Sequence, residues 1–460
     1  MRLLFISKNA LTLIEIIENS GFEAFAVGGC VRDSLMHKQC HDIDITTSAS
    51  PFEVEKILSE NNIGFIETGL KHGTITALLN GQPFEITTYR ADGEYKDNRH
   101  PENVEFVSDI KEDLSRRDFT INAMAYNHSK GVVDLFSGQE DIKNKLIRAV
   151  GDANKRFNED ALRIMRAIRF ASVLSFDIEE NTKKAIFDNK ELLKNVSAER
   201  LFTELSKLLL GDNAYQILID YREILAVIIP ELTPMFDCAQ NNPWHIYDVY
   251  THTCKSVVSC PEDLNLRLTM LLHDIGKPIV KTTDQNGVDH FKKHQAESAK
   301  IASDILKRFK VSNDIYNFAM TLIPIHDITL SPNKKCIKKW LNKLGQGSSG
   351  EYYLKHLLNV RLADRLSQNP EKTYIEIEEI NYISGLIDNI IEENEAFKIS
   401  DLNINGFDLM SLGIKGKEIG ETLNLLLDKV IDEELENEKS ILIEYVKKNT
   451  LDLDANHKEV

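Results

Sequence analysis

Two aspartates near the N-terminus, Asp42 and Asp44, have the spacing expected of a metal site. Residues 43–46 have strand character, and side chains alternate along a strand, so both carboxylates project to the same face. Neighbouring carboxylates repel each other unless a cation lies between them, and Mg²⁺ prefers such hard oxygen ligands. The pair therefore predicts a Mg²⁺ site for phosphoryl transfer, in which bound ions stabilise the attacking and leaving oxygens.

A glycine-rich turn precedes these acids. The run Val-Gly-Gly-Cys-Val-Arg-Asp occupies residues 27–33. Two glycines between a strand and a helix let the backbone approach a phosphate closely, and the start of the helix directs amides towards it. Gly29 is therefore a candidate nucleotide contact, and the planar guanidinium of Arg32 could reach a triphosphate.

Paired arginines follow in the run Glu-Asp-Leu-Ser-Arg-Arg-Asp-Phe-Thr-Ile-Asn-Ala at residues 112–123. Arginines beside acids suit a triphosphate cradle, with Arg117 as a candidate contact. In this interpretation Asp118 and Asn122 fix the arginine rotamers or bind the ribose.

A third group of residues predicts base selection. Asp160, Arg163, Arg166 and Arg169 recur at every third position, which predicts a slowly winding strip along one helix over residues 157–174. Asp160 would accept a hydrogen bond from an exocyclic amine, and Arg163 would donate to a ring nitrogen or carbonyl. Cytosine and adenine carry that amine and uracil does not, so the pair could select C and A without a template. Arg166 and Arg169 would face phosphate.

A second constellation lies downstream, where histidines and aspartates recur across a helix-rich region. It comprises His252, His273 with Asp274, His290, His294, His326 with Asp327, and Asp364. Histidine nitrogens and carboxylate oxygens that converge from several helices can hold one or two divalent cations. The pattern predicts a metal centre separate from the first.

The elements that must position these residues divide into two kinds. Short strands are expected at 22–27 and 43–46, and a hairpin at 74–79 and 84–89 is joined at Asn80-Gly81. From about residue 143 the pattern is helical. Helices are expected at 157–174, 181–189, 198–210, 214–225, 249–259, 264–273, 294–309, 335–344, 375–393 and 416–435. This order predicts a mixed α/β head followed by a long helical body.

Composition narrows the class of protein. A chain of 460 residues is too long for one core, so several domains are expected. No apolar stretch approaches a membrane span, and the N-terminus lacks a signal-peptide pattern. The six cysteines form no Cys-x-x-Cys pair, which indicates reduced thiols in a cytoplasmic protein. The net charge is −17, yet residues 143–170 hold eight Lys/Arg against three Asp/Glu, which favours phosphate binding at one place.

The motifs between residues 22 and 210 closely resemble the class II tRNA nucleotidyltransferases of bacteria, the CCA-adding enzymes. Further shared segments are Asp-Leu-Phe-Ser-Gly at 134–138 and Ser-Ala-Glu-Arg at 197–200. The resemblance implies an α+β fold, with a polymerase-β-like head and mixed sheet before an all-α neck, body and tail. It implies Mg²⁺ at Asp42 and Asp44. The implied nucleotide contacts are Gly29, Arg32, Arg117, Asp160, Arg163, Arg166 and Arg169. Cys30 stands where a small residue is usual.

The same resemblance implies the reaction and the partners. Members add C, C and A to the 3′ end of tRNA from CTP and ATP and release pyrophosphate. Residues 90–101 resemble a loop used for the final A, which favours a full CCA or an A-only enzyme over a CC-only one. Residues 404–419 and 436–438 resemble the tail that grips the tRNA elbow.

The run His-Asp-Ile-Gly-Lys at 273–277, with Thr-His-Thr at 251–253, resembles the HD phosphohydrolase superfamily. The ligands implied are His252, His273, Asp274 and Asp364, while His294 and His326 could complete a second metal. The resemblance implies Ni²⁺ or Mn²⁺ and hydrolysis of 2′,3′-cyclic or terminal phosphates in 3′-end repair. The expected divisions are a head at 1–142, a neck and body at 143–235, an HD domain at 236–370 and a tail at 371–460.

Two alternatives remain open from sequence. The chain could be an A-adding tRNA enzyme or a poly(A) polymerase of the same superfamily. It could instead be an HD phosphohydrolase whose head has become a nucleotide sensor. The intact Asp42 and Asp44 pair argues against the second alternative. The sequence gives no indication of oligomeric state.

Overall fold

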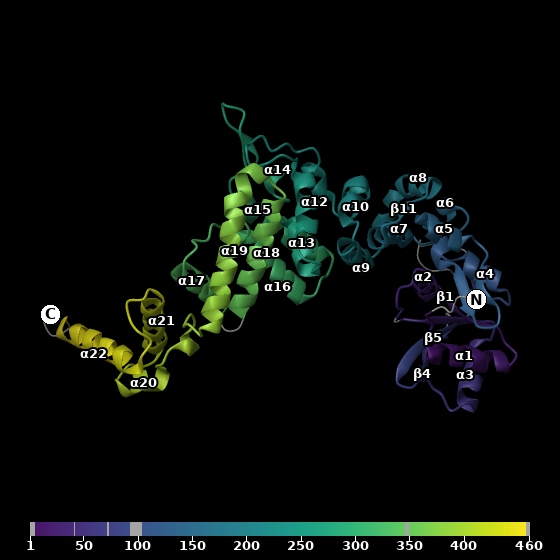
Figure 1. Ribbon diagram of the computed structural model, residues 1–460, viewed down its shortest axis with the longest axis horizontal. Helices are drawn as coiled ribbons and strands as arrows, with labels where there is room; N and C mark the ends of the chain where they lie inside the picture. The colour runs from purple at the N-terminus through teal and green to yellow at the C-terminus, as the bar shows by residue number, and fades with distance from the viewer. Residues whose placement is uncertain (1–4, 41, 71–72, 93–103, 346–348, 457–460) are drawn as a thin grey trace. The chain divides into compact units, whose positions relative to one another are not determined.

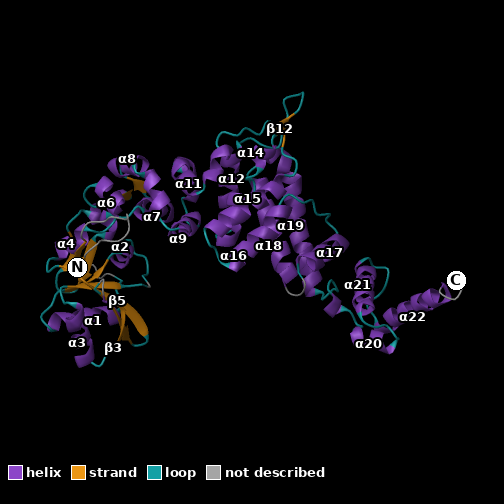
Figure 2. Ribbon diagram, turned by 180° about the vertical axis from the view of Figure 1, so that it is seen from behind, coloured by secondary structure: helices purple, strands orange, loops and turns teal. Residues whose placement is uncertain are grey.

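The computed structural model describes residues 5–40, 42–70, 73–92, 104–345 and 349–456. The chain forms two compact units, Met1–Pro230 and Glu231–Val460. The larger sheet lies in the first unit, and the second is built almost entirely of helices (Figures 1 and 2). The expected fold class, a mixed-sheet head followed by helices, is confirmed. Among the described residues no helix is both long and apolar enough to cross a membrane.

A seven-stranded mixed sheet organises the head. The strands are β1 (Ala24–Val27), β2 (Asp44–Thr47), β3 (Gly64–Gly69), β4 (Thr74–Leu79), β5 (Gln82–Thr88), β8 (Met124–Asn127) and β9 (Gly131–Asp134). Their order is β3-β4-β5-β2-β1-β8-β9, and β2 and β5 are parallel whereas the other neighbours are antiparallel. The hairpin expected at Asn80-Gly81 is therefore confirmed as β4 and β5. Strands β6 (Arg90–Asp92) and β7 (Val104–Phe106) pair separately. The rest of the predicted 90–101 loop lies outside the described residues.

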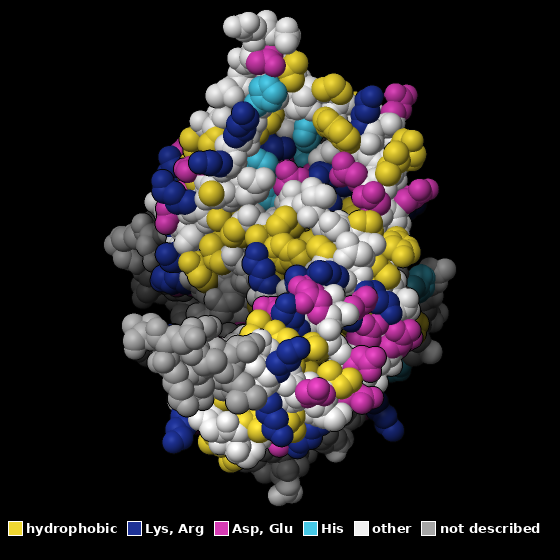
Figure 3. All heavy atoms as spheres, turned by 90° about the vertical axis from the view of Figure 1, so that its left-hand side faces the viewer, with side chains coloured by type: hydrophobic (Ala, Val, Ile, Leu, Met, Phe, Trp, Pro, Cys, Tyr) yellow, Lys and Arg dark blue, Asp and Glu magenta, His cyan; other side chains and the backbone are white. Residues whose placement is uncertain are grey.

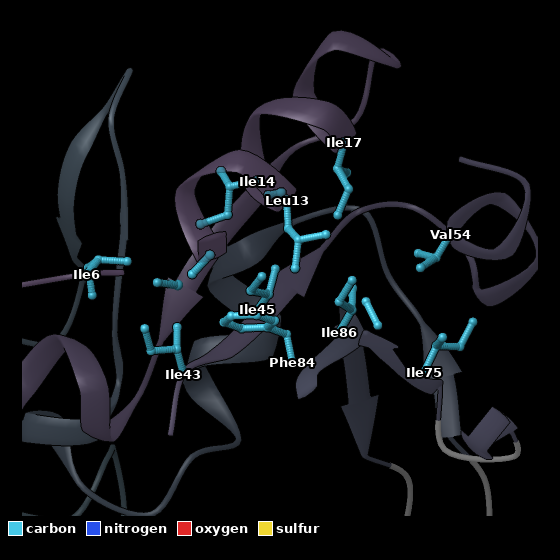
Figure 4. Packing of buried hydrophobic residues seen from close by; sticks show 14 of the residues in the cluster. Ile6, Leu13, Ile14, Ile17, Ile43, Ile45, Val54, Ile75, Phe84 and Ile86 are labelled. Carbon is cyan, nitrogen blue, oxygen red and sulfur yellow. The ribbon is translucent and has the colours of Figure 1, made fainter. Parts of the chain in front are cut away.

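Helices α1 (Lys8–Asn19) and α3 (Pro51–Glu60) pack against the sheet. Ser7 caps the start of α1, and its side chain accepts a hydrogen bond from the Ala10 amide. Its fully buried Leu13 and Ile17 point towards isoleucines of the strands (Figure 4). Ile45, from β2, belongs to this core, so packing fixes the strand that carries Asp44.

The other elements of the first unit surround the site and continue into helices. They are α2 (Gly29–Leu35), α4 (Ile110–Ser115), the 3₁₀ turn η2 (Thr120–Asn122), α5 (Gly138–Asn144), β10 (Leu146–Ile147), α6 (Ala153–Glu159), α7 (Leu162–Leu174), β11 (Asp177–Ile178), α8 (Glu180–Asp188), η3 (Lys190–Asn195), α9 (Ala198–Leu209), α10 (Ala214–Asp220) and α11 (Arg222–Ile228). The single helices expected at 157–174 and 214–225 are wrong, because each is interrupted. Asp160 has extended φ and ψ of −135° and 104°, and Tyr221 ends α10.

The second unit is helical apart from a short hairpin. Its elements are η4 (Pro230–Met235, which starts at the boundary), α12 (Val249–Ser259), α13 (Leu264–Leu272), α14 (Lys277–Val280), β12 (Thr282–Thr283), β13 (Asp289–His290), α15 (His294–Arg308), α16 (Asn313–Leu322), η5 (Ile323–Ile325), α17 (Lys334–Leu344), α18 (Ser349–Leu366), α19 (Pro370–Glu392), η6 (Ile399–Asp401), α20 (Gly406–Ser411), α21 (Lys417–Ile431) and α22 (Lys439–Asn456). Helix α18 packs against α12, α13, α16, α17 and α19.

Candidate active site and candidate metal centre

The glycine turn lies between β1 and α2. Gly28 has φ +82° and ψ −131°, which a side chain makes costly, and its amide donates to the Met124 carbonyl at 3.1 Å. A Cβ at Gly28 would lie 3.2 Å from Nη1 of Arg117. The turn is therefore restricted to glycine both by backbone conformation and by the adjacent arginine.

Substitution of Gly28 by alanine tests this turn. We expect Gly28→Ala to cost about 1–3 kcal/mol of stability and to displace Arg117, lowering nucleotide incorporation by roughly tenfold because small displacements at a reactive site are costly. Gly81→Ala is the matched control, since Gly81 also has positive φ (+76°) but nothing within 4 Å of its Cβ position. Thermal unfolding and incorporation rates of the two variants provide the measurement. Equal activity in both variants would contradict the proposed role of the turn.

The predicted alternation holds across the two aspartates, although β2 begins at Asp44 and Asp42 lies before it. Asp42 and Asp44 are exposed, whereas Ile43 and Ile45 are buried. Asp44 lies opposite Val27 in the β1–β2 register, which brings it close to the glycine turn. Although the Asp44 side chain is exposed, partial desolvation by the surrounding protein, followed by the Glu85 carboxylate, raises its pKa. This repulsion is what a bound cation would relieve.

Glu85 is an acid that the sequence reasoning missed. It is exposed on β5 between buried Phe84 and Ile86, and β5 is the parallel neighbour of β2. Ile45 pairs with Ile86, so Asp44 and Glu85 each directly precede a paired residue on neighbouring strands, and the Glu85 charge raises the pKa of Asp44. The sequence pattern that could have identified Glu85 is an acid between two apolar residues of a predicted strand.

Arg32 is held in place by two side chains. Its Nη1 donates to Oδ1 of Asn122 at 2.6 Å, and its Nε donates to Asp33 at 2.8 Å. The guanidinium carbon also lies 5.1 Å from the centre of the Phe170 ring. The interpretation that Asn122 fixes an arginine rotamer agrees with this contact.

Arg117 and the predicted base-reading residues line one pocket of about 260 Å³ in the first unit. Its lining residues are Arg116, Arg117, Asp118, Asp160, Leu162, Arg163, Arg166 and Arg200. The buried Asp113 carboxylate pairs with Arg116 at 2.7 Å and with Arg117 at 3.3 Å, which orients both. Of the predicted contacts, Gly29, Arg32 and Arg169 are not among the lining residues.

Asp160 lies before α7 and not on it, which corrects the expected helical strip. Its Oδ1 accepts from the Leu162 amide at 3.1 Å, in the first turn of α7. Its Oδ2 pairs with Nη2 of Arg200 at 2.8 Å. Sequence reasoning assigned no role to Arg200, although it belongs to the quoted Ser-Ala-Glu-Arg segment. The carboxylate is thus fixed from both sides at the pocket wall.

The three arginines of α7 have different partners. Arg163 donates to Glu159 at 2.7 Å and to the Arg116 carbonyl at 2.8 Å. Arg166 pairs with Asp118 at 2.5 Å. The last of the three, Arg169, pairs with Glu204 of α9 at 2.8 Å and stacks 3.5 Å over Phe170. Glu159 and Glu204 were also missed, because their partners lie one turn away or on another helix.

The Asp118–Arg166 pair predicts a pH dependence. Burial alone would raise the pKa of Asp118, but the Arg166 charge outweighs it and lowers the value from 3.8 to about 2. A carboxyl whose pKa is depressed by folding stabilises above its unfolded value and loses that contribution as the pH falls towards 2. The contribution is on the order of 2 kcal/mol. We expect wild type to lose more stability than Asp118→Asn between about pH 6 and pH 3, measured by urea unfolding. Parallel losses would contradict the assignment.

The predicted ligands of the second constellation meet in the second unit. Nε2 of His252 lies 3.0 Å from Asp364 and 3.4 Å from Asp274. Nε2 of His273 lies 3.2 Å from Asp274. These side chains come from α12, the end of α13 and α18, and all four are buried.

His294 and His326 converge on the other oxygen of Asp274. Their Nε2 atoms lie 3.3 and 3.7 Å from its Oδ1 and 3.2 Å from each other. Two three-residue groups therefore have ligand atoms within 4.8 Å of one another and share Asp274: His252 and His273 in one, His294 and His326 in the other.

The hydrogen bonds of the four imidazoles suit metal ligation. Each Nδ1 contacts a backbone carbonyl: Ser367 for His252, Met270 for His273, Phe291 for His294 and Ile323 for His326. Nδ1 must donate to those carbonyls, so a neutral ring presents its Nε2 lone pair to the centre. With neutral rings, Nε2 of His252, Nε2 of His273 and Oδ1 of Asp274 are buried acceptors without a donor, while Oδ2 of Asp274 pairs with Nζ of Lys277 at 2.6 Å. Unpaired buried acceptors of this kind fit a cation.

A pocket of about 570 Å³ opens onto this centre. Its lining includes Asp274, His294, His326 and Asp364 together with the basic residues Lys277, Lys292, Lys293 and Arg365. Histidine side chains gather among basic and acidic ones in the upper part of the face shown in Figure 3. Candidate metal ligands beside lysines suit an anionic ligand.

Family models of known proteins match the head and a large part of the second unit. Residues 24–148 match the family model described as the Poly A polymerase head domain. Residues 294–446 match a model of tRNA nucleotidyltransferase domain 2. The crystal structure of the Bacillus stearothermophilus CCA-adding enzyme in complex with CTP superposes with a TM-score of 0.70 at 27% identity, covering 99% of this chain and 100% of that one.

Some curated relatives match about half of this chain, and others match nearly its full length. The CCA-adding enzyme of Lactobacillus helveticus is 51% identical over 214 residues, but the match covers only 46% of this chain and 53% of that protein. This chain therefore spans about half the length of some curated relatives it matches. The CCA-adding enzyme of Ligilactobacillus salivarius is 36% identical over 453 residues, 96% of each chain, and that of Pediococcus pentosaceus is 34% identical over 96% of this chain and 98% of its own. On this full-length similarity, the chain belongs to the CCA-adding enzyme family.

Proposed function

We propose that this protein adds C, C and A to the 3′ end of tRNA from CTP and ATP, without a nucleic-acid template and with release of pyrophosphate. The observation that carries the proposal is Asp44 at the start of β2 beside the glycine turn, with Asp42 just before the strand, in the same unit as the pocket of arginines and Asp160. Family membership supports tRNA as the substrate, because the relatives that match over nearly their full length are CCA-adding enzymes.

In this proposal Asp42 and Asp44 hold Mg²⁺ and Glu85 adds negative charge beside them. Bound magnesium supplies stabilisation of the attacking hydroxyl and of the leaving pyrophosphate. The side chains of Arg32 and Arg117 hold and neutralise the triphosphate, since Asn122 and Asp113 already fix their guanidinium groups.

Base selection depends on Asp160 and Arg163. Arg200 and the Leu162 amide hold the Asp160 carboxylate, while Glu159 and the Arg116 carbonyl hold Arg163. Both side chains line the same pocket. A fixed acceptor beside a fixed donor matches the hydrogen-bonding edge of cytosine or adenine and leaves uracil without its amine partner.

Addition to defined tRNA ends tests the proposal. With radiolabelled CTP and ATP, a tRNA that ends at the discriminator base gains C, C and A and then stops. Repeated addition of A would instead support a poly(A) polymerase, and addition only to a tRNA that already ends in CC would support an A-adding enzyme. UTP supplied alone should not be incorporated.

The second unit supports a second function, hydrolysis of 2′,3′-cyclic or terminal phosphates at an HD-type centre. The ligands are His252, His273, Asp274 and Asp364, with His294 and His326 completing a second position, and Ni²⁺ or Mn²⁺ is the proposed metal. The observation that favours it is the convergence of buried histidine nitrogens and the Asp274 carboxylate in two groups whose ligand atoms lie within 4.8 Å of one another. When bound, the metal supplies an activated water for attack on phosphorus. The adjacent Lys277, Lys292 and Lys293 bind the phosphate.

We further propose that the chain has four functional divisions. They are a head at 1–142, a neck and body at 143–235, an HD domain at 236–370 and a tail at 371–460. The protein acts in the cytoplasm. In the tail, Phe407 and Met410 of α20 are 79% and 46% exposed. Neutral exposed side chains of this kind suit a grip on the tRNA elbow by shape, given the negative charge of the tail.

A further inference from the structure

An exposed tryptophan lines the pocket that opens onto the histidine and aspartate centre of the second unit. Trp244 is 44% exposed, and it is one of only two tryptophans in the chain. The other, Trp340, lies on α17. An aromatic ring open to solvent inside a pocket suits ligand contact, because a ligand that covers the ring removes apolar surface from water. Neither reaction proposed above uses Trp244.

The backbone that carries Trp244 is fixed in place. Its amide donates to Oδ1 of Asn242 at 3.0 Å. Its carbonyl accepts from the amide of Asn369, the residue before α19, at 2.8 Å. The Asn369 side chain also donates to the Pro243 carbonyl at 3.0 Å. A ring on a fixed segment loses less conformational freedom on binding a ligand than a ring on a loose loop.

The same segment leads directly to the candidate metal centre. His245 follows Trp244, and its ring packs edge-on against the ring of His252, with the two ring centroids 5.2 Å apart. Consecutive Cα atoms lie about 3.8 Å apart, so Trp244 is one residue from a side chain that touches a candidate ligand. Asp274, which both ligand groups share, lines the same pocket as Trp244.

Other lining residues suit the phosphate and the base of a nucleotide. Lys292 and Lys293 line the pocket immediately before His294, so positive charge accompanies the candidate metal ligands. The side-chain amides of Asn242 and Gln295 belong to the same lining and can hydrogen-bond the edge of a base. The pocket volume of about 570 Å³ lies within the range of about 300–1,000 Å³ usual for small-molecule sites.

We propose that Trp244 stacks on the base of a terminal nucleotide while the candidate metal ligands and the lysines hold its phosphate. This inference rests on the proposed hydrolysis and narrows its substrate. The site takes nucleotides whose terminal base is unpaired, because a base within a duplex already stacks on its neighbours and cannot lie on the tryptophan. Phosphate esters without a base are poor ligands. Stacking accepts every base but is stronger for a larger ring, so adenine binds more tightly than uracil.

Tryptophan fluorescence of the metal-free protein tests binding without hydrolysis. In the full-length Trp340→Phe protein Trp244 is the only tryptophan, and titration with AMP in the presence of EDTA should change its emission to saturation. UMP should require a several-fold higher concentration, and inorganic phosphate alone should cause no change. The reciprocal Trp244→Phe protein, which retains Trp340, should not respond to AMP. Unchanged Trp244 emission, or an equal change with inorganic phosphate, would overturn the proposal.

Kinetics separate the base contact from the hydrolytic centre. Trp244→Ala should raise the KM for 2′,3′-cyclic AMP by roughly tenfold, and should leave the KM for glycerol 1,2-cyclic phosphate, which has no base, unchanged. Ile246→Ala is the matched control, because Ile246 is 53% exposed two residues along the chain but is not among the described lining residues. A wild-type KM for 2′,3′-cyclic AMP in Trp244→Ala would refute the base site alone. If AMP changes Trp244 emission but no metal supports hydrolysis, the hydrolytic function fails and the base site stands.

Discussion

Replacing Asp42 or Asp44 by alanine should lower nucleotide addition to tRNA by roughly 10³-fold or more, because loss of several kcal/mol of metal stabilisation in the transition state has that effect on rate. Single-turnover incorporation of labelled CTP on a tRNA lacking CCA provides the measurement. The loss should not reflect unfolding, since burial and the Glu85 charge already disfavour the ionised Asp44.

A matched strand carboxylate controls for loss of charge alone. Glu67 is exposed on β3 of the same sheet, and Glu67→Ala should retain addition. Phosphate hydrolysis by the second unit should be unchanged in all three variants. Addition that survives in Asp42→Ala and Asp44→Ala would refute the assignment of the metal site, while hydrolysis lost together with addition would mean that the two sites are not independent.

Replacing Asp274 by alanine should abolish both metal binding and phosphate hydrolysis in the second unit. Asp274 is the residue shared by the two groups of ligand atoms, so its removal takes a ligand from each. We expect the hydrolysis of 2′,3′-cyclic AMP to fall by roughly 10³-fold for the same energetic reason as above. Metal content after incubation with Mn²⁺ and dialysis gives a readout that is independent of substrate.

His252→Ala offers a second variant, since Asp274 also pairs with Lys277 at 2.6 Å and its loss affects local stability. His356→Ala is the control, because His356 lies on α18 but its ring contacts Tyr352 and Phe318. The control should keep metal and hydrolysis, and all three variants should keep CCA addition. Wild-type metal content in Asp274→Ala and His252→Ala would exclude the proposed centre.

Local sequence patterns correctly predicted the features of the head that depend on residue periodicity alone. Period-two alternation placed Asp42 and Asp44 on one face, and buried Ile43 and Ile45 on the other confirm it. The break at Asp160 was missed because its neighbours all favour a helix. The available signal was the preference of aspartate for the position before a helix.

Sequence patterns could not predict contacts between residues that only the tertiary structure brings together. Arg200 reaches Asp160 across 40 positions, and nothing in local spacing predicts that pair. Helix α18 was missed although it carries Asp364, because it packs against five other helices of the described residues. A helix buried on several sides has no single apolar face for a periodicity to reveal.

A crystal structure with CTP and Mg²⁺ tests the central claim most directly. The account predicts a cation between the carboxylates of Asp42 and Asp44, the triphosphate near Arg32 and Arg117, and the cytosine edge within hydrogen-bonding distance of Asp160 and Arg163. A nucleotide bound away from α7, or a triphosphate with no ion at the two aspartates, would contradict it.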